Sequence, residues 1–407
     1  MHTTPPKPGM TDDATCRTYV PAPVAASRDL RAMVREHLAR RACEQIDAAA
    51  VEREAALGAT ARFDAWRAGI EQRVAAMLDL GDLGSQPLNV RPVSTHERGG
   101  VVIENVLFES IAGWQVNATV FRPRGDGPYP AIVVPVGHSM KTNRPYQLPC
   151  QVFARAGYLA ITFDPPGQGG EKQPGNDHFT DGVRCYAVGQ SSNRYFIADA
   201  LRAMDYLDSR ADVRSDLGYA MTGVSGGGHT TMWAALVDPR VRVASPVCCV
   251  SPLASHPVRD DYALCRGQLP AGRLAQGIDH VDLLCAAAPR PQLYMAGRDD
   301  EVYEPNFTQA VCNTLERVYA AVGAGGRFEH FVGACGHDYT TEMARLLVRF
   351  VDRHLLDEPD REHDAAFDED PPVLPAEAMR CMPAAEPNTR TITAGVAASL
   401  SRARRRM

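Results

Sequence analysis

The chain has 407 residues, of which 45% are apolar and 23% charged, an ordinary globular composition that can bury a core. The 43 Lys and Arg against 49 Asp and Glu give a net charge of −6, so no global basic field favours nucleic acid or anionic lipid. No run reaches the roughly 20 apolar residues of a membrane span, and the first residues do not resemble a signal peptide. We expect a cytoplasmic protein with no nucleic-acid or membrane partner.

The N-terminal quarter predicts an arm followed by two helices. Residues 1–26 are rich in Pro, Thr and Ala, and we expect them to form a flexible arm. Ser27 is a plausible N-cap, and apolar residues then recur at helical spacing from Leu30 towards Leu57. A second amphipathic pattern follows, carried by Phe63, Trp66, Ile70, Val74 and Met77. Residues 27–100 are therefore expected to form a helical N-terminal extension.

Between residues 101 and 356, short apolar runs alternate with helical patterns. Val101–Leu107 and Gln115–Phe121 predict a pair of strands, and Glu342–Leu355 predicts the last helix. The remaining runs are typical of strands buried on both faces, and they are Ala131–Val136, Leu159–Phe163, Tyr219–Thr222, Val241–Val247, Gln292–Ala296 and Phe328–Val332. This alternation predicts an α/β fold with a mostly parallel central sheet covered by helices on both faces. Residues 101–356 are the expected catalytic domain.

The last 51 residues differ in composition from the rest. Asp357–Asp370 contains eight acidic residues and one Arg, Pro and Ala follow, and the chain ends in SRARRRM. Charge blocks of this kind are usually solvated or disordered. We expect residues 357–407 to form a flexible tail.

The segment GVSGG, residues 223–227, matches the G-x-S-x-G pattern of a nucleophile elbow. An apolar run precedes Ser225 and a helix-compatible run follows it, as this strand–turn–helix motif requires. Flanking glycines let two backbones approach in the sharp turn, and a helix N-terminus favours developing negative charge. Ser225 is therefore the candidate nucleophile, and the alternative is a glycine-rich turn with an incidental serine.

A serine hydroxyl needs a base, and the base needs an orienting carboxylate. His337 lies in the loop after the last predicted strand, where an open α/β sheet presents its reacting groups, so it is the candidate base. A loop-capping role is the alternative for this histidine. The carboxylate should lie between the serine and the histidine in the chain. Asp300 is favoured, Asp299 is the reserve and Glu301 is weaker.

Acyl transfer also needs donors directed at the oxyanion. We expect these to be the backbone N–H of Gly226 and that of His138, in the loop after Ala131–Val136. An ordinary strand-to-helix turn is the alternative for that loop. Loops 167–195 and 250–280 are the expected substrate pocket, with the candidate side chains His178, Tyr186 and Trp233.

The eleven cysteines scatter from Cys16 to Cys381 without a CxxC pair. In a reducing compartment such cysteines are mostly small buried residues, and no cluster has zinc-ligand spacing. We expect no metal and no organic cofactor.

Several motifs resemble those of the α/β-hydrolase superfamily. Within it the chain resembles the acetyl xylan esterase-like serine hydrolases, relatives of the dienelactone hydrolase and prolyl oligopeptidase catalytic domains. The resemblance covers residues 27–356 and is carried by VPVGHSMKTNRP, FDPPGQGGEKQ, GVSGGGHTT and GACGHDY, among others. It implies Ser225 as nucleophile, His337 as base and Asp300 as its orienting acid. Val136 stands where relatives commonly carry a His before the oxyanion loop.

The leading hypothesis is a serine hydrolase that cleaves a carboxylic ester, such as a short acyl or acetyl ester of a small sugar or metabolite. One alternative is a prolyl oligopeptidase-like peptidase or amidase, although the residues before the first strand lack the pattern of a β-propeller. Another is a lyase, an acyltransferase or a small-molecule binder on the same fold. The N-terminal helices could pack on their own domain or on a second copy, so a homo-oligomer stays an open expectation.

Overall fold

The computed structural model describes residues 30–81, 86–168, 171, 178–186, 190–250, 270, 272–303, 305–363 and 367–382. The predicted arm at residues 1–26, the end of the predicted tail and most of the 250–280 loop lie outside these residues. The strands are β1 Arg91–Arg98, β2 Val101–Ile111, β3 Trp114–Arg122, β4 Ala131–Pro135, β5 Leu159–Phe163, β6 Tyr219–Val224, β7 Val241–Val247, β8 Gln292–Gly297 and β9 Phe328–Gly333. The helices are α1 Leu30–Ala56, α2 Thr60–Leu78, α3 Arg144–Arg155, α4 His178–Tyr186, α5 Asn193–Asp208, α6 Gly226–Val237, α7 His280–Ala286, α8 Pro305–Ala321 and α9 Thr341–Val351.

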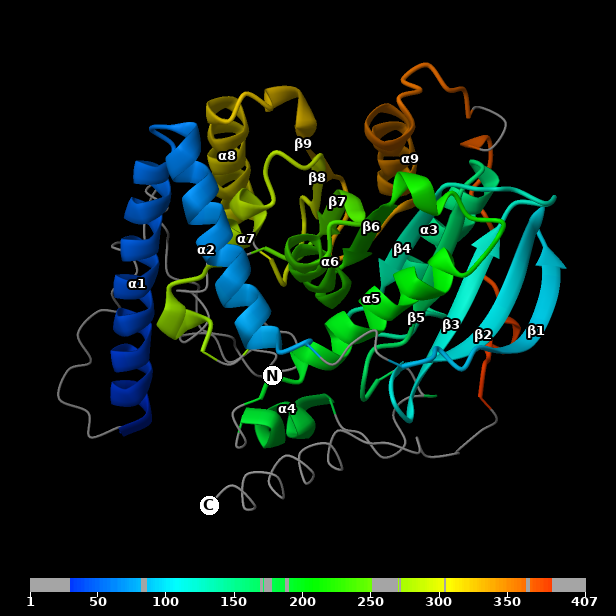
Figure 1. Ribbon diagram of the computed structural model, residues 1–407, viewed down its shortest axis with the longest axis horizontal. Coiled ribbons are helices and arrows are strands. Elements are labelled where there is room, and N and C mark those ends of the chain that lie inside the picture. The colour runs from blue at the N-terminus through cyan, green and yellow to red at the C-terminus, as the bar shows by residue number, and fades with distance from the viewer. Residues whose placement is uncertain are drawn as a thin grey trace, which may run out of the picture.

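One sheet of nine strands runs through the molecule in the order β1-β2-β3-β5-β4-β6-β7-β8-β9 (Figure 1). The first three strands are antiparallel, and β3 also pairs antiparallel with β5. From β5 onward all the pairings are parallel. Strands β4, β5, β6 and β8 are buried along their whole length, which is why they read as continuous apolar runs. The predicted α/β fold with a mostly parallel sheet is confirmed.

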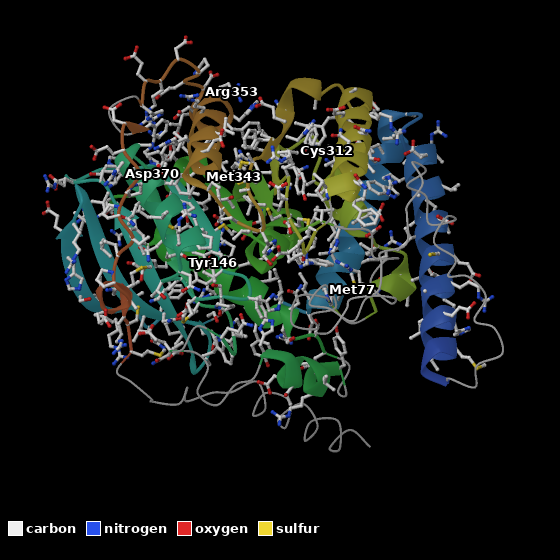
Figure 2. All side chains as sticks on the ribbon, turned by 180° about the vertical axis from the view of Figure 1, so that it is seen from behind. Met77, Tyr146, Cys312, Met343, Arg353 and Asp370 are labelled. Carbon is white, nitrogen blue, oxygen red and sulfur yellow. The ribbon has the colours of Figure 1, made fainter. Side chains whose placement is uncertain are left out.

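Helices cover both faces of this sheet. Helices α3 and α9 pack on one face, in an apolar cluster that includes Tyr146 and Met343. On the other face α5, α6 and α8 pack against the strands, and α2 and α7 pack onto these helices. Figure 2 shows Tyr146 and Met343 on the first side, and Met77 and Cys312 towards α2 and α8. The sheet is thus the middle layer of three.

The two helices predicted at the N-terminal end are both present. Helix α2 buries Phe63, Ile70, Val74 and Leu78 in the same apolar cluster as Trp233 of α6, so it is packed into the catalytic fold. Helix α1 instead leaves several of the apolar residues that predicted it more than half exposed, and these are Met33, Val34 and Leu38.

Two predicted boundaries are wrong. Strand β1 extends the sheet before residue 101, because the polar segment Arg91–Arg98 pairs with β2 as an exposed edge strand. In the expected tail, Leu374 and Met379 are buried in the core cluster of α3 and α9. Residues 371–382 therefore belong to the folded body, where Gln151 and Gln147 of α3 donate to the carbonyls of Pro372 and Leu374.

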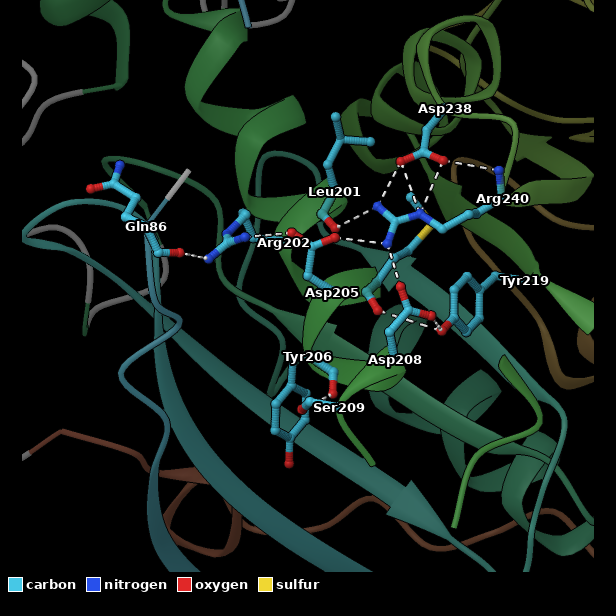
Figure 3. Close-up of polar contacts among 11 residues, drawn as sticks. Gln86, Leu201, Arg202, Asp205, Tyr206, Asp208, Ser209, Tyr219, Asp238 and Arg240 are labelled. Carbon is cyan, nitrogen blue, oxygen red and sulfur yellow. Dashed lines mark hydrogen bonds and ion pairs between the residues drawn. The ribbon is translucent and has the colours of Figure 1, made fainter. Parts of the chain in front are cut away.

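A charged network fixes the end of the sheet opposite the elbow (Figure 3). Arg240, just before β7, pairs with Asp205 and Asp208 of α5 and with Asp238 at the end of α6. The hydroxyl of Tyr219, the first residue of β6, donates to Asp208 at 2.5 Å. This network ties the beginning of β6 and the end of α6 to α5, so the strand–turn–helix unit is held at both outer ends.

Most cysteines are buried thiols, as expected. Eight are free in the described part of the chain, and seven of these are buried. Cys43 of α1 differs, because it is disulfide-bonded. Among the helices that the structure describes, none has the length and apolar character needed to cross a membrane.

Candidate active site

Ser225 stands on a strained turn between β6 and α6. Its φ is 60° and its ψ is −121°, a conformation that costs a non-glycine residue about 1–3 kcal/mol. A Cβ on Gly223 would lie 2.6 Å from the carbonyl oxygen of Pro135, and one on Gly227 would overlap the same carbonyl. The backbone N–H of Ser225 donates to Val247 at 2.9 Å. The strain and the glycines together are those of a nucleophile elbow.

His337 and Asp300 are hydrogen-bonded to each other. The His337 Nδ1 and Asp300 Oδ2 atoms are 3.0 Å apart, with the Asp300 side chain fully buried and the imidazole 23% exposed. The other carboxylate oxygen of Asp300 accepts from the backbone N–H groups of Val302 and Tyr303, at 2.8 and 2.9 Å. Asp300 follows β8 and His337 follows β9, at the carboxyl ends of neighbouring parallel strands. This carboxylate therefore orients this imidazole.

The charge of Asp300 is stabilised in place. Burial alone would raise its pKa, but the hydrogen bonds from His337 and the two backbone N–H groups outweigh burial and lower it. Asp299 is different, because its side chain is 61% exposed and pairs with the adjacent Arg298, at 3.0 Å. Glu301 is also exposed. Of the three acids that the sequence offered, the structure brings Asp300 to the histidine.

The turn at Ser225 and the His337–Asp300 pair meet at Cys248. This residue follows Val247, which accepts the Ser225 N–H, and its own N–H donates to Met295 of β8. Its thiol, the Asp300 carboxylate and the His337 ring have side-chain atoms within 4.8 Å of one another. Burial raises the pKa of Cys248, which favours the thiol over a metal-binding thiolate. The group fits a hydrogen-bonded catalytic set better than a metal site.

The loop after β4 lies against the beginning of α6. A Cβ on Gly137 would be 2.7 Å from the Gly226 nitrogen, so only glycine lets the two backbones approach. The Gly137 N–H donates to the buried hydroxyl of Tyr146 at 3.1 Å, and that hydroxyl lies 3.5 Å from the carbonyl of Val224. Tyr146 thus links the loop to the strand residue before Ser225, a connection that sequence reasoning missed. The loop therefore lies against the Gly226 N–H, and the His138 N–H as a second oxyanion donor stays a prediction.

The side chain of His138, in this loop, is hydrogen-bonded to that of His178, at the beginning of α4. His178 Nδ1 donates to the carbonyl of Pro166 at 3.2 Å, which leaves its Nε2 to accept from His138 Nε2 at 3.0 Å. Burial, together with the neighbouring histidines, lowers the pKa of His138 to about 3, so its ring is neutral. The predicted substrate residue His178 therefore helps to hold the predicted oxyanion loop.

A lysine in the same loop joins it to the end of the described chain. The buried Lys141 donates from Nζ to the carbonyl of Met379 at 2.6 Å and lies 3.4 Å from Glu171. Its backbone N–H donates to Asp164 Oδ1 at 2.7 Å. The contact between Lys141 and Met379 therefore ties the candidate oxyanion loop to residues 371–382, which pack against α3 and α9.

Ring contacts connect His337 through Tyr303 to two further histidines, His229 and His280. Tyr303 stacks on His337, with ring centroids 5.7 Å apart, and its hydroxyl lies 3.3 Å from His229 Nε2. His229, one turn after Ser225 on α6, donates from Nε2 to the carbonyl of Cys249 at 2.7 Å, and its ring lies 4.7 Å from that of His280. Tyr303 was not found from the sequence, because a single tyrosine after the acid carries no pattern.

The other two predicted substrate residues differ in position. Tyr186 ends α4, is partly exposed, and is electrostatically coupled to Arg273. Trp233 is fully buried in the cluster between α2 and α6, so it is a core residue rather than a pocket wall. Its expected role as a substrate contact is wrong, because α2 covers the helix face that the sequence left unassigned.

Comparisons with known proteins agree with this geometry. Residues 86–259 match the sequence model of the family described as acetyl xylan esterase (AXE1). The chain is 26% identical over 294 residues to the Bacillus subtilis (strain 168) protein named "Putative hydrolase YtaP", a match that covers 68% of this chain and 96% of that protein.

Two solved structures show the same fold. Methylesterase BT1017 superposes with a TM-score of 0.69 at 20% identity, over 89% of this chain and 80% of that one. A glucuronoyl esterase from Solibacter usitatus superposes with a TM-score of 0.54 at 15% identity, over 70% of this chain and 91% of that one. The chain therefore has the fold of these esterases, and its residues 86–259 are similar in sequence to the acetyl xylan esterase family.

Proposed function

We propose that the protein hydrolyses a short acyl or acetyl ester through an acyl-enzyme on Ser225. The observation that carries this proposal is the hydrogen bond between His337 and the buried carboxylate of Asp300, together with the strained elbow that holds Ser225 after β6. Because an ionised carboxylate only accepts hydrogen bonds, His337 Nδ1 is the donor, and the lone pair of a neutral ring then lies on Nε2. That is the tautomer a general base needs.

In the proposed reaction Ser225 Oγ attacks the ester carbonyl while His337 Nε2 takes its proton. Asp300 stabilises the imidazolium that forms, and His337 then returns the proton to the leaving alcohol. The backbone N–H groups of Gly226 and His138 stabilise the tetrahedral oxyanion, with Gly226 helped by its place at the beginning of α6. Water activated by the same histidine then releases the acyl group from Ser225.

The proposed substrate is an ester of a small sugar or metabolite. The resemblance to acetyl xylan esterases supports an acetyl or other short acyl group. The cytoplasmic location stays a prediction. The disulfide at Cys43 speaks against it, because reducing compartments disfavour such bonds.

The test is hydrolysis of 4-nitrophenyl acetate by the wild type, by Ser225→Ala and by the matched control Ser209→Ala. Ser209 is exposed at the end of α5, where it donates to the carbonyl of Tyr206, far from the elbow. We expect Ser225→Ala to lose turnover and fluorophosphonate labelling while its melting temperature is kept, and Ser209→Ala to retain both activities. Full turnover by Ser225→Ala would remove the basis of the proposal.

A further inference from the structure

A buried arginine with no ion-pair partner among the described residues lies between β7 and α7. Arg273 is 2% exposed, and its guanidinium carbon lies 5.6 Å from the centre of the Trp233 ring. Within the described ranges, neither of its terminal nitrogens, Nη1 and Nη2, has a hydrogen-bond partner. A buried charged group in this condition destabilises the folded protein unless a partner binds it.

The neighbouring carboxylates are already engaged. Asp282 pairs with Arg53 at 2.5 Å, and its other oxygen accepts from the backbone N–H of Asp279 at 2.9 Å. Asp279 caps α7 by accepting from the backbone N–H of His280 at 2.6 Å. Among the residues the structure describes, no carboxylate lies within ion-pair distance of Arg273. The guanidinium therefore has no direct ion pair among these residues. Burial lowers its pKa to about 10, an effect that the charge of nearby Asp279 partly offsets, so it is cationic at neutral pH.

This charge lies on the side of the site formed by α6 and the Tyr303 loop. Trp233 and His229 follow Ser225 on α6 by eight and four residues, so the three lie along one side of the helix. A rise of about 1.5 Å per residue puts Trp233 about 12 Å from Ser225, and helical side chains lean back towards the N-terminus. Burial and then the charge of Arg273 lower the pKa of His229, as expected for a cation on this side of α6. Arg273 is thus on the order of 10 Å from Ser225.

We propose that Arg273 binds a carboxylate carried by the ester substrate. The substrate class would be esters of carboxylated compounds, in which the free carboxylate lies between the scissile carbonyl and the guanidinium, roughly 6 Å from the carbonyl. Two unpaired terminal nitrogens in a planar fork match the two oxygens of a carboxylate, and such paired, charge-assisted bonds are strong. This inference rests on the proposed ester hydrolysis, and it further specifies that the ester carries a negative charge.

The test compares matched anionic and neutral esters. One pair, 4-nitrophenyl hydrogen glutarate and its terminal amide, places the charge on the acyl side. The other, 4-acetoxybenzoate and 4-acetoxybenzamide, places it on the alcohol side. The ratio of kcat/KM within each pair is measured for the wild type, for Arg273→Gln and for Arg317→Gln. Arg317 is an exposed arginine paired with Glu54, so its variant removes one charge without touching the site.

We expect the wild type to prefer the anion in at least one pair, and Arg273→Gln to lower that ratio by about 10–100-fold, the worth of a charge-assisted contact. Arg317→Gln should keep the wild-type ratio. Because an unpaired buried charge is removed, the melting temperature of Arg273→Gln should not fall.

Equal rates within both pairs in the wild type would overturn the inference while leaving ester hydrolysis intact. A lower melting temperature with an unchanged ratio would also overturn it, because Arg273 would then be structural. No hydrolysis of any ester by the wild type would instead refute the proposed function itself.

Discussion

Replacing Asp300 by Asn tests the orientation of the proposed base. The amide oxygen would keep the two backbone donors, Val302 and Tyr303, at 2.8 and 2.9 Å. The amide NH₂ would then face His337 Nδ1 across 3.0 Å, where two donors cannot meet. The imidazole must move its proton to Nε2, and that nitrogen can no longer accept from Ser225. We expect kcat for 4-nitrophenyl acetate to fall by about 10³–10⁴-fold, which is about 4–5.5 kcal/mol of transition-state stabilisation.

Asp299→Asn is the matched control, because the same change is made one residue away on a side chain that is 61% exposed. Its kcat should stay within about twofold of the wild type, since exposed ion pairs contribute little. Steady-state kinetics and circular dichroism on both variants separate a catalytic loss from a folding loss. If Asp300→Asn kept its kcat, or if Asp299→Asn lost it instead, the assignment of the orienting acid would be refuted.

Three further predictions concern the surroundings of the site. Tyr146→Phe leaves the buried N–H of Gly137 unpaired at a cost of about 1–3 kcal/mol, so we expect kcat to fall by roughly 10-fold with little change in KM; an unchanged kcat would show that this link is dispensable. Burial lowers the pKa of His229 from 6.5 to about 3, so below pH 6.5 the unfolded chain binds a proton that the native chain does not. As the pH is lowered from 6.5 towards 3, the free energy of unfolding should then fall by up to about 1.4 kcal/mol per pH unit. In urea unfolding, His229→Asn should lose less stability over this range than the wild type, and equal slopes would contradict this. Ending the chain after residue 370 removes the Met379 carbonyl from Lys141, so the melting temperature and esterase activity should both fall, whereas ending it after residue 382 should preserve them.

The parts of the fold that were predictable are those whose sequence pattern follows directly from burial. Ala131–Pro135 and Leu159–Phe163 are buried on both faces, so they could only be apolar runs. Strand β1 was missed because an edge strand exposed along most of Arg91–Arg98 needs no apolar alternation. The fold of residues 371–382 was missed because its Pro-rich segment is held by backbone carbonyls, which no residue type announces.

The same division holds within the site. Ser225 and His337 were predictable because the elbow and the loop after the last strand have fixed chemical requirements. Asp300 could be placed only to within a residue, since the sequence does not show which of two adjacent side chains turns inward. Tyr146 was missed because its hydroxyl reaches Val224, which is far away in the chain. Arg273 was missed because its proposed partner is the substrate, so no residue spacing indicates it.

The contact between Lys141 and Met379 also has a consequence for the order in which the site can form during synthesis. The nucleophile, the acid and the base have all left the ribosome before residue 379 emerges. The loop expected to stabilise the oxyanion, however, gains the Lys141 contact only when the segment that carries Met379 packs on the sheet. A nascent chain therefore carries every proposed reacting side chain before this support of the oxyanion loop can form, and the support is added once residue 379 has emerged.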